Sequence, residues 1–166
     1  TRPILIEIQA LVDKSMLPNP KRLTVGTDAQ RLTMLLAILH RHVTLSTYDQ
    51  DVFLNAVGGI KINETASDLA VLIAIVSSMT NQAVSSKTAI FGEVGLGGEI
   101  RPVSRGQERI KEASKLGFKR IIVPLKNKAS DIPDVEIIGV DNLRDAVKVV
   151  FGSNRVKNDE QIYPDE

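Results

Sequence analysis

The chain has 166 residues, of which 43% are hydrophobic and 25% are charged, and it carries a formal net charge of +1. That length can bury one sizeable core, so we expect a single soluble domain over residues 1–152 and a disordered polar tail over residues 153–166. Cysteine is absent, which excludes disulfides, thiolate zinc sites and a cysteine nucleophile. No apolar run is long enough to span a membrane and no signal peptide is recognisable, so we expect a cytoplasmic protein without membrane contact. Because strand-like sequence follows Thr1 directly, we expect a piece of a longer protein.

The first third of the chain predicts two strands and a helix. Residues 2–12 are apolar and β-branched with polar residues interleaved, which favours a strand with one wetter face. A turn follows around two prolines, and residues 23–26 predict a short returning strand. Thr27 or Asp28 can cap the next helix. The apolar stripe of that helix consists of Leu32, Leu35, Leu36, Leu39 and Val43.

The rest of the chain mixes strands and helices. Residues 52–57 predict a strand, and residues 65–79 predict a buried helix, because they are apolar on every side. Thr65 with Asp68 predicts a capping box at the start of that helix. We then expect strands at 88–93, 99–101, 120–124 and 136–140, and helices at 105–116 and 142–150. The sequence therefore predicts an α+β domain of mixed α/β type.

Four glycines, Gly92, Gly95, Gly97 and Gly98, invite comparison with a phosphate-binding loop. The segment lacks the Lys-Ser/Thr pair of a P-loop, and its spacing does not match a dinucleotide fingerprint. It also lies between two predicted strands, whereas a phosphate loop enters a helix N-terminus. We therefore interpret it as a glycine-rich hairpin turn, and we expect no ATP binding by this chain.

Three segments carry a family resemblance: ETASDLAVLIAIVSS at 64–78, FGEVGLGGEIRPVSRGQER at 91–109 and GFKRIIVP at 117–124. In this order and spacing they resemble the Lon-protease-like domain at the C-terminus of the RadA (Sms) family of bacterial DNA-repair ATPases. The resemblance covers about residues 2 to 151. It implies a Lon-protease-like domain over residues 1–152, with the ribosomal protein S5 domain 2-like architecture.

Lon-type peptidases use a serine nucleophile and a lysine base, which takes the proton of the serine hydroxyl. The resemblance aligns Ala66 with the nucleophile and Gln107 with the base. Alanine has no nucleophilic atom, and a glutamine amide accepts no proton at neutral pH. We therefore expect no enzyme activity from this chain. Gln107 has a structural interpretation as well, because Ser104 and Gln107 have the spacing of a helix capping box.

A Ser-dependent peptidase remains the enzymatic alternative. Ser67 is one residue from the nucleophile position, but one step along a helix rotates the side chain by roughly 100°, so its hydroxyl should point elsewhere. Lys61 is the candidate base in that alternative. Neither His40 nor His42 fits a metal site, since two residues apart on a helix they face different directions. We expect no metal ligands and no catalytic residues.

Basic residues near the former active-site face are the candidates for DNA binding. If they converge, they make a positive patch that holds phosphates and releases counterions. Neighbouring glutamates can instead cancel the field of each one. The absence of an aromatic residue among them favours contact with the backbone of duplex or branched DNA over base stacking. The candidates are Arg31, Lys61, Arg101, Arg105 and Arg109.

The resemblance also implies a role for the whole protein. It would have an N-terminal zinc-binding motif and a RecA-like core using ATP and Mg, so ATP, Mg and Zn belong to parts outside this chain. It would act in DNA damage repair by branch migration of recombination intermediates, with a recombinase partner. This domain would serve as a homo-oligomeric scaffold, expected to be a hexameric ring, and as a DNA-binding surface. The alternative without chemistry is a ring-forming scaffold that makes no DNA contact.

Overall fold

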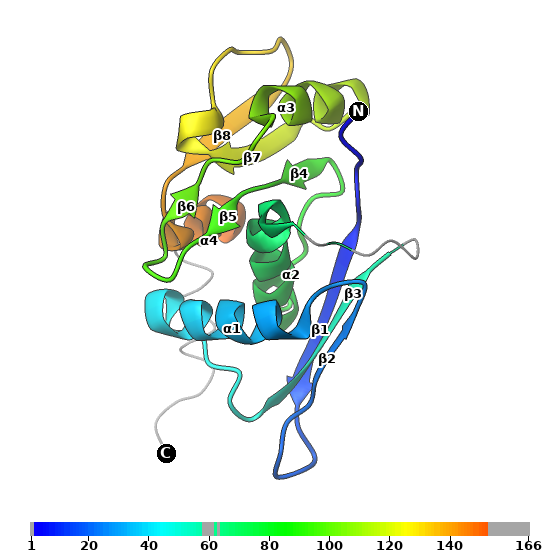
Figure 1. The fold of residues 1–166 in the computed structure, drawn as a ribbon, viewed down its shortest axis with the longest axis vertical. Helices are drawn as coiled ribbons and strands as arrows, with labels where there is room; N and C mark the ends of the chain where they lie inside the picture. Colours follow the sequence, from blue (N-terminus) through cyan, green and yellow to red (C-terminus); the bar gives the residue numbers. More distant parts are fainter. Residues whose placement is uncertain (1, 58–61, 63, 153–166) are drawn as a thin grey trace.

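The computed structural model describes residues 2–57, 62 and 64–152, which form two sheets, four α-helices and a short hairpin. Figure 1 shows one three-stranded sheet in the lower half of the molecule and another in the upper half, with helix α2 (Asp68–Thr80) between them. The mixed α+β class predicted from the sequence is confirmed. The expected tail at 153–166 lies outside the described residues.

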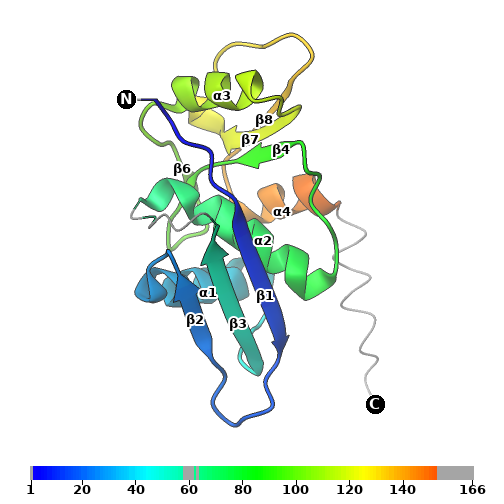
Figure 2. The same ribbon diagram turned by 90° about the vertical axis from the view of Figure 1, so that its right-hand side faces the viewer.

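The first sheet consists of β1 (Ile8–Lys14), β2 (Arg22–Val25) and β3 (Gln50–Ala56) in the order β1-β3-β2. Strand β1 pairs with β3 antiparallel and β2 pairs with β3 in parallel. Helices α1 (Ala29–Val43) and α2 cover one face of this sheet (Figure 2). The prediction of a strand over residues 2–12 was wrong at its start, since residues 2–7 lie outside the strand and β1 begins at Ile8.

Helix α1 (Ala29–Val43) follows the predicted pattern. The side chain of Asp28 caps it by accepting a hydrogen bond of 2.9 Å from the backbone N–H of Gln30. All five residues of the predicted apolar stripe are buried. Three basic side chains, His40, Arg41 and His42, occupy its last turn, where they complement the helix dipole.

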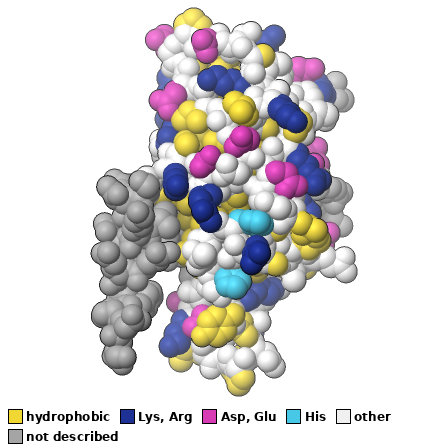
Figure 3. Space-filling model, turned by 90° about the vertical axis from the view of Figure 1, so that its left-hand side faces the viewer, with side chains coloured by type: hydrophobic (Ala, Val, Ile, Leu, Met, Phe, Trp, Pro, Cys, Tyr) yellow, Lys and Arg dark blue, Asp and Glu magenta, His cyan; other side chains and the backbone are white. Residues whose placement is uncertain are grey.

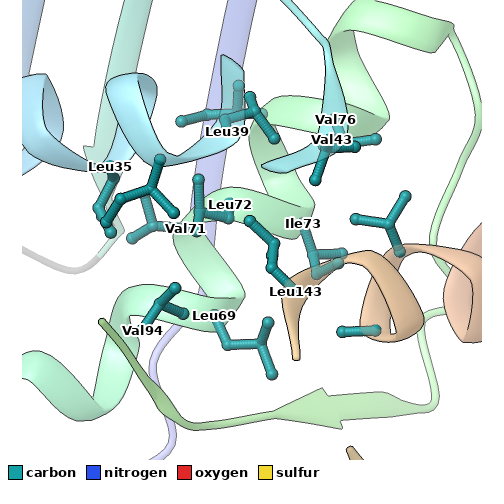
Figure 4. Close-up of a cluster of buried hydrophobic side chains, with 14 of the residues drawn as sticks. Leu35, Leu39, Val43, Leu69, Val71, Leu72, Ile73, Val76, Val94 and Leu143 are labelled. Carbon is teal, nitrogen blue, oxygen red and sulfur yellow. The ribbon is translucent and has the colours of Figure 1, made fainter. Parts of the chain in front are cut away.

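Helix α2 has no exposed residue, as its composition predicts, although Ala70, Ala74 and residues 77–79 are only half-buried. Leu69, Leu72, Ile75 and Val76 have no exposed surface, and the helix lies at the centre of the main core (Figure 4). The capping-box prediction was wrong. A 3₁₀ turn, η1 (Thr65–Ser67), precedes the helix without any side-chain cap, and the Asp68 carboxylate binds another partner.

The second sheet contains β4 (Thr88–Ile90), β7 (Arg120–Pro124) and β8 (Glu136–Val140), all parallel, in the order β4-β7-β8. Alternate residues of β7 face opposite sides. Ile121 and Val123 pack with α3 (Gly106–Lys115), whereas Ile122 packs in the core that contains α2 and α4 (Leu143–Phe151). Helices therefore cover both faces of this sheet.

A two-stranded hairpin, β5 (Glu93–Val94) and β6 (Ile100–Arg101), lies beside the second sheet. The single strand predicted at 88–93 is thus two strands, interrupted at Phe91 and Gly92. The 3₁₀ turn η2 (Leu125–Asn127) follows β7 and contacts β8. These short elements determine the surroundings of the candidate site.

Candidate functional site

Ala66, at the position expected for a nucleophile, is buried in η1 with 6% of its surface exposed. Its carbonyl accepts a hydrogen bond of 2.8 Å from the N–H of Gly92, and the Gly92 carbonyl accepts one of 3.0 Å from the N–H of Leu69. The start of α2 is therefore bound to the segment between β4 and β5 through the backbone. The only side-chain atom that Ala66 contributes here is a methyl carbon.

Gln107, at the position expected for the base, lies in the first turn of α3. Its side-chain amide donates to the carbonyl of Asn127 in η2. The Asn127 side chain in turn accepts from the N–H of Val103 at 2.8 Å and donates to the Val103 carbonyl at 3.1 Å. The predicted capping box was wrong, because Arg105 precedes the helix in a left-handed conformation without a side-chain cap. The amide of Gln107 joins α3 to η2 instead.

Ser67, the alternative nucleophile, is half-buried, and its hydroxyl donates to the carbonyl of Glu64 at 3.1 Å. A main-chain carbonyl does not act as a general base at neutral pH, so this bond gives the hydroxyl no activation. Lys61, the proposed base, lies outside the described residues.

An open groove runs past the start of α2. It has a volume of about 1160 Å³, and its lining includes Ala66, Ser67, Arg105 and Arg109. Residues 2–10 form one of its walls, and apolar side chains supply much of the rest. Two of the five predicted DNA-binding residues therefore lie at this groove.

Arg31 forms a partly buried ion pair. Its guanidinium donates through Nε to Asp68 Oδ1 at 3.0 Å and through Nη2 to Asp68 Oδ2 and to the carbonyl of Val94, the latter at 3.0 Å. Asp68 is only 1% exposed and also accepts from the N–H of Val94 at 3.0 Å. The hydrogen bond to Asp68 raises the pKa of Arg31 above its ordinary value. This pair joins α1, α2 and β5.

The other described candidates also have acidic partners. Arg101 pairs with Glu99 at 2.8 Å and Arg105 pairs with Glu108. Arg109 pairs with Glu64 at 2.9 Å and donates to the Ser104 carbonyl at 3.0 Å. Arg31 thus contacts β5 of the glycine hairpin, and Arg101 lies on β6 of the same hairpin. Arg105 and Arg109 line the groove. Figure 3 shows basic and acidic side chains interspersed on the face that carries the histidines.

The predicted glycine-rich hairpin turn is confirmed. Gly98 donates to the Gly95 carbonyl at 2.9 Å, and Gly95 donates to the Glu99 carbonyl at 2.9 Å. The backbone N–H groups of Glu99 and Gly97, together with Arg101, lower the pKa of the Glu99 carboxyl. A Cβ at Gly95 would lie 1.8 Å from Glu99 Oε1. This loop therefore holds a carboxylate of its own chain, which sequence reasoning missed although Glu99 follows the glycines directly.

His42 has a structural position at the same hairpin. Its Nε2 lies 2.8 Å from the carbonyl oxygen of Leu96, and a Cβ at Gly98 would lie 2.9 Å from the ring. His40 is exposed. Within the described residues no three His, Asp or Glu side chains come together as a metal site would require. Nor does any described helix combine the length and the apolar character needed to cross a membrane.

Comparison with known proteins first identifies a class of domain. A family model described as "Subunit ChlI of Mg-chelatase" matches residues 33–127 of this chain. That range runs from α1 to η2 and includes α2, the glycine hairpin and both positions expected for the dyad. The chain is therefore an α+β domain similar to that family over more than half of its length.

Individual relatives then narrow the assignment from a class of domain to one protein family. The chain is 56% identical over 152 residues to the DNA repair protein RadA of Pseudomonas aeruginosa, covering 91% of this chain and 34% of that protein. It is 55% identical over 150 residues to that of Escherichia coli (90% and 33%) and 44% identical over 154 residues to that of Bacillus subtilis (92% and 34%). The chain belongs to this bacterial DNA repair protein RadA family. It spans about a third of the length of the relatives it matches.

Proposed function

We propose that this chain is a catalytically inactive Lon-like domain, which serves a DNA-repair ATPase as an oligomerisation scaffold and as a DNA-contacting surface. The observation that carries the proposal is the state of the two dyad positions. Ala66 offers no nucleophile, and the Gln107 amide is bonded to the backbone of Asn127. Both positions contribute to folding, so the domain acts through its surfaces.

The DNA contact in this proposal is made to the phosphate backbone of duplex or branched DNA. Each described candidate arginine has an acidic partner, so a phosphate has to compete with a carboxylate for the guanidinium. Arg101 is the best placed for this exchange, because 54% of its side chain is exposed, against 27% for Arg31 and 22% for Arg109. Arg31 has the weakest case, since releasing it would leave the buried Asp68 uncompensated.

In the longer proteins of the family, the remaining two thirds of the chain would supply the zinc-binding motif and the ATPase core that uses ATP and Mg. Copies of this domain would assemble into a hexameric ring in the cytoplasm. DNA passing along the ring would then undergo branch migration together with a recombinase partner. The support for this part is membership of the DNA repair protein family.

Binding of a fluorescent duplex across a salt series, with the mass in solution measured in parallel, tests the DNA contact. We expect affinity to fall linearly with log salt, with a slope that reports the number of phosphates contacted. Arg101→Glu and Lys61→Glu should each reduce both the affinity and the slope. The matched control is Lys87→Glu, because Lys87 is exposed and lies outside the proposed surface. Absence of binding at low salt from a confirmed multimer would leave a scaffold without DNA contact.

Cleavage of an unfolded protein substrate tests the peptidase alternative. The proposal predicts no cleavage, and no change in DNA binding or assembly in Ser67→Ala. Cleavage that is present in the original chain and lost in Ser67→Ala would overturn the inactive assignment.

A further inference from the structure

The outer face of the first sheet carries an uncovered apolar row. The register pairs Leu11 of β1 with Phe53 of β3, and Phe53 with Leu23 of β2. Leu11 and Leu23 expose 58% and 56% of their surfaces, and Phe53 is half-buried. Figure 2 looks onto this face, with α1 and α2 behind the sheet. Within the described part of the chain, no helix packs against it.

Polar residues border this row on both sides. Towards one end of the strands lie Gln9 and Asn55, which are paired in the register, beside Val25. Towards the other end lie Asp13 and Asp51, also paired, with the exposed Lys21 beside Asp51, which accepts a hydrogen bond of 2.7 Å from the Lys21 N–H. One border is therefore formed mainly by amides and the other mainly by carboxylates. This order of an amide row, an apolar row and a carboxylate row follows directly from the strand register.

We infer that this face binds the same face of a second copy of the chain. The two copies would be related by a two-fold axis that lies between the faces and runs across the strands, along the row of Leu11, Phe53 and Leu23. This rotation reverses the strand direction and places the apolar row of one copy against the apolar row of the other. The amides of Gln9 and Asn55 then meet the carboxylates of Asp13 and Asp51 of the second copy. Amide N–H groups donate to carboxylates, so the surface is complementary to itself.

The size of the apolar surface fits this occupant. Leu11, Leu23 and Val25 each expose between 56% and 58% of their surface and lie next to the half-buried Phe53, so they form the kind of contiguous apolar patch that marks an interaction site. A standard interface buries about 800 Å² on each partner, with an apolar centre and a polar rim. The apolar row supplies the centre and the two polar rows supply the rim. A polyanion such as DNA fits this face poorly, because the centre is apolar and Asp13 and Asp51 offset the charge of Lys21.

The inference rests on the proposed role in assembly in one respect: both require that copies of this chain associate. It names a surface and a symmetry that the ring proposal leaves open. Two-fold contacts occur in an even-numbered assembly with dihedral symmetry, in which they join two sets of subunits face to face.

Sedimentation velocity of the purified chain over about a hundredfold range of concentration tests the contact, because mass action makes association depend on concentration. We expect a concentration-dependent dimer or a larger even-numbered assembly. Leu23→Lys should raise the dissociation constant about a hundredfold, because the new charges would meet each other across the axis. The control Leu96→Lys changes a leucine at the tip of the glycine hairpin that is 68% exposed, against 56% for Leu23, and should leave association unchanged.

Two substitutions at Asn55 test the symmetry itself. Asn55→Lys places a cation opposite Asp51 of the second copy and should tighten association, whereas Asn55→Asp places like charges together and should weaken it about tenfold. Unchanged assembly in Leu23→Lys and both Asn55 variants would overturn the inference while leaving the scaffold proposal intact. A chain that stays monomeric at every concentration would overturn both and assign the face to another part of the longer family proteins.

Discussion

The two sheets of this domain differ in what covers them. In the first, residues of β1 and β3 alternate between buried, such as Val12 and Val52, and outward-facing, such as Leu11. In the second, four consecutive residues of β7 are buried, because α3 packs on one face and α2 and α4 pack on the other. Parallel sheets are usually covered on both faces, whereas an antiparallel pair can leave one face open. The same chain therefore uses one sheet as core and keeps one face of the other available for contacts.

The largest effect that this comparison predicts is at Ile121, which has no exposed surface on β7. Ile121→Ala should lower the free energy of unfolding by about 2–5 kcal/mol, through lost burial and the remaining cavity. Leu23→Ala on the open face is the matched control, and it should change stability by only about 0.5 kcal/mol. Urea unfolding followed by circular dichroism, at concentrations where the chain is monomeric, measures both. Similar losses at the two positions would show that the first sheet is covered as fully as the second.

A somewhat smaller effect on stability is expected at the ion pair of Arg31 and Asp68, which joins α1, α2 and β5. Asp68→Ala removes the carboxylate that binds Arg31 and the N–H of Val94, leaving a partly buried guanidinium without its acidic partner. Breaking a buried pair in this way costs about 3–5 kcal/mol. Because Arg31 is about a quarter exposed, we expect about 2–3 kcal/mol here. Urea unfolding of the single variants and of Asp68→Ala with Arg31→Ala gives the coupling between them. Strictly additive losses would show that the pair contributes nothing as a pair.

Asn127 and Gln107 give a finer test of how η2 is joined to α3 and to the segment before it. Asn127→Ala should cost about 1–3 kcal/mol, because the half-buried N–H and carbonyl of Val103 lose their partners. Gln107→Ala should cost about 1 kcal/mol, since it removes one hydrogen bond to the Asn127 carbonyl. Thermal unfolding by calorimetry ranks the two variants. A larger loss for Gln107→Ala would contradict the view that its amide has only a supporting structural role.

Sequence periodicity predicted most of the fold, because buried apolar residues recur with the period of the helix or strand that carries them. The all-round apolar character of residues 65–79 predicted the buried α2, and the stripe on α1 predicted its packed face. The errors came from polar side chains with two possible partners. Asp68 and Gln107 both have capping-box spacing, yet each binds a group distant in sequence, which local patterns do not reveal.

The candidate site was predictable only in part, for the same reason. The types of residue at positions 66 and 107 already carry the proposal that the Ser-Lys dyad is missing. The acidic partners of the basic residues were harder to assign: Arg109 reaches Glu64, which is 45 positions away in the sequence. Arg101 and Arg105 pair with Glu99 and Glu108, two and three positions away, as a local pattern allows. Sequence therefore indicated the two local ion pairs and missed the long-range pairs of Arg31 and Arg109.

The smallest predicted effect concerns the glycine hairpin. The hydrogen bond from its own backbone N–H, followed by the Arg101 guanidinium, lowers the pKa of Glu99 below its ordinary value of 4.5. A lowered pKa means that the folded hairpin favours the carboxylate. Its contribution is therefore complete above the ordinary pKa and is lost as the pH falls through the lowered value. NMR titration of the Glu99 carboxyl measures this directly. Because the hydrogen bond from the N–H of Glu99 is the largest single cause and remains in the variant, Arg101→Met should raise the pKa only part of the way to 4.5. A full return to 4.5 in Arg101→Met would show that the guanidinium, and not the glycine turn, holds the carboxylate.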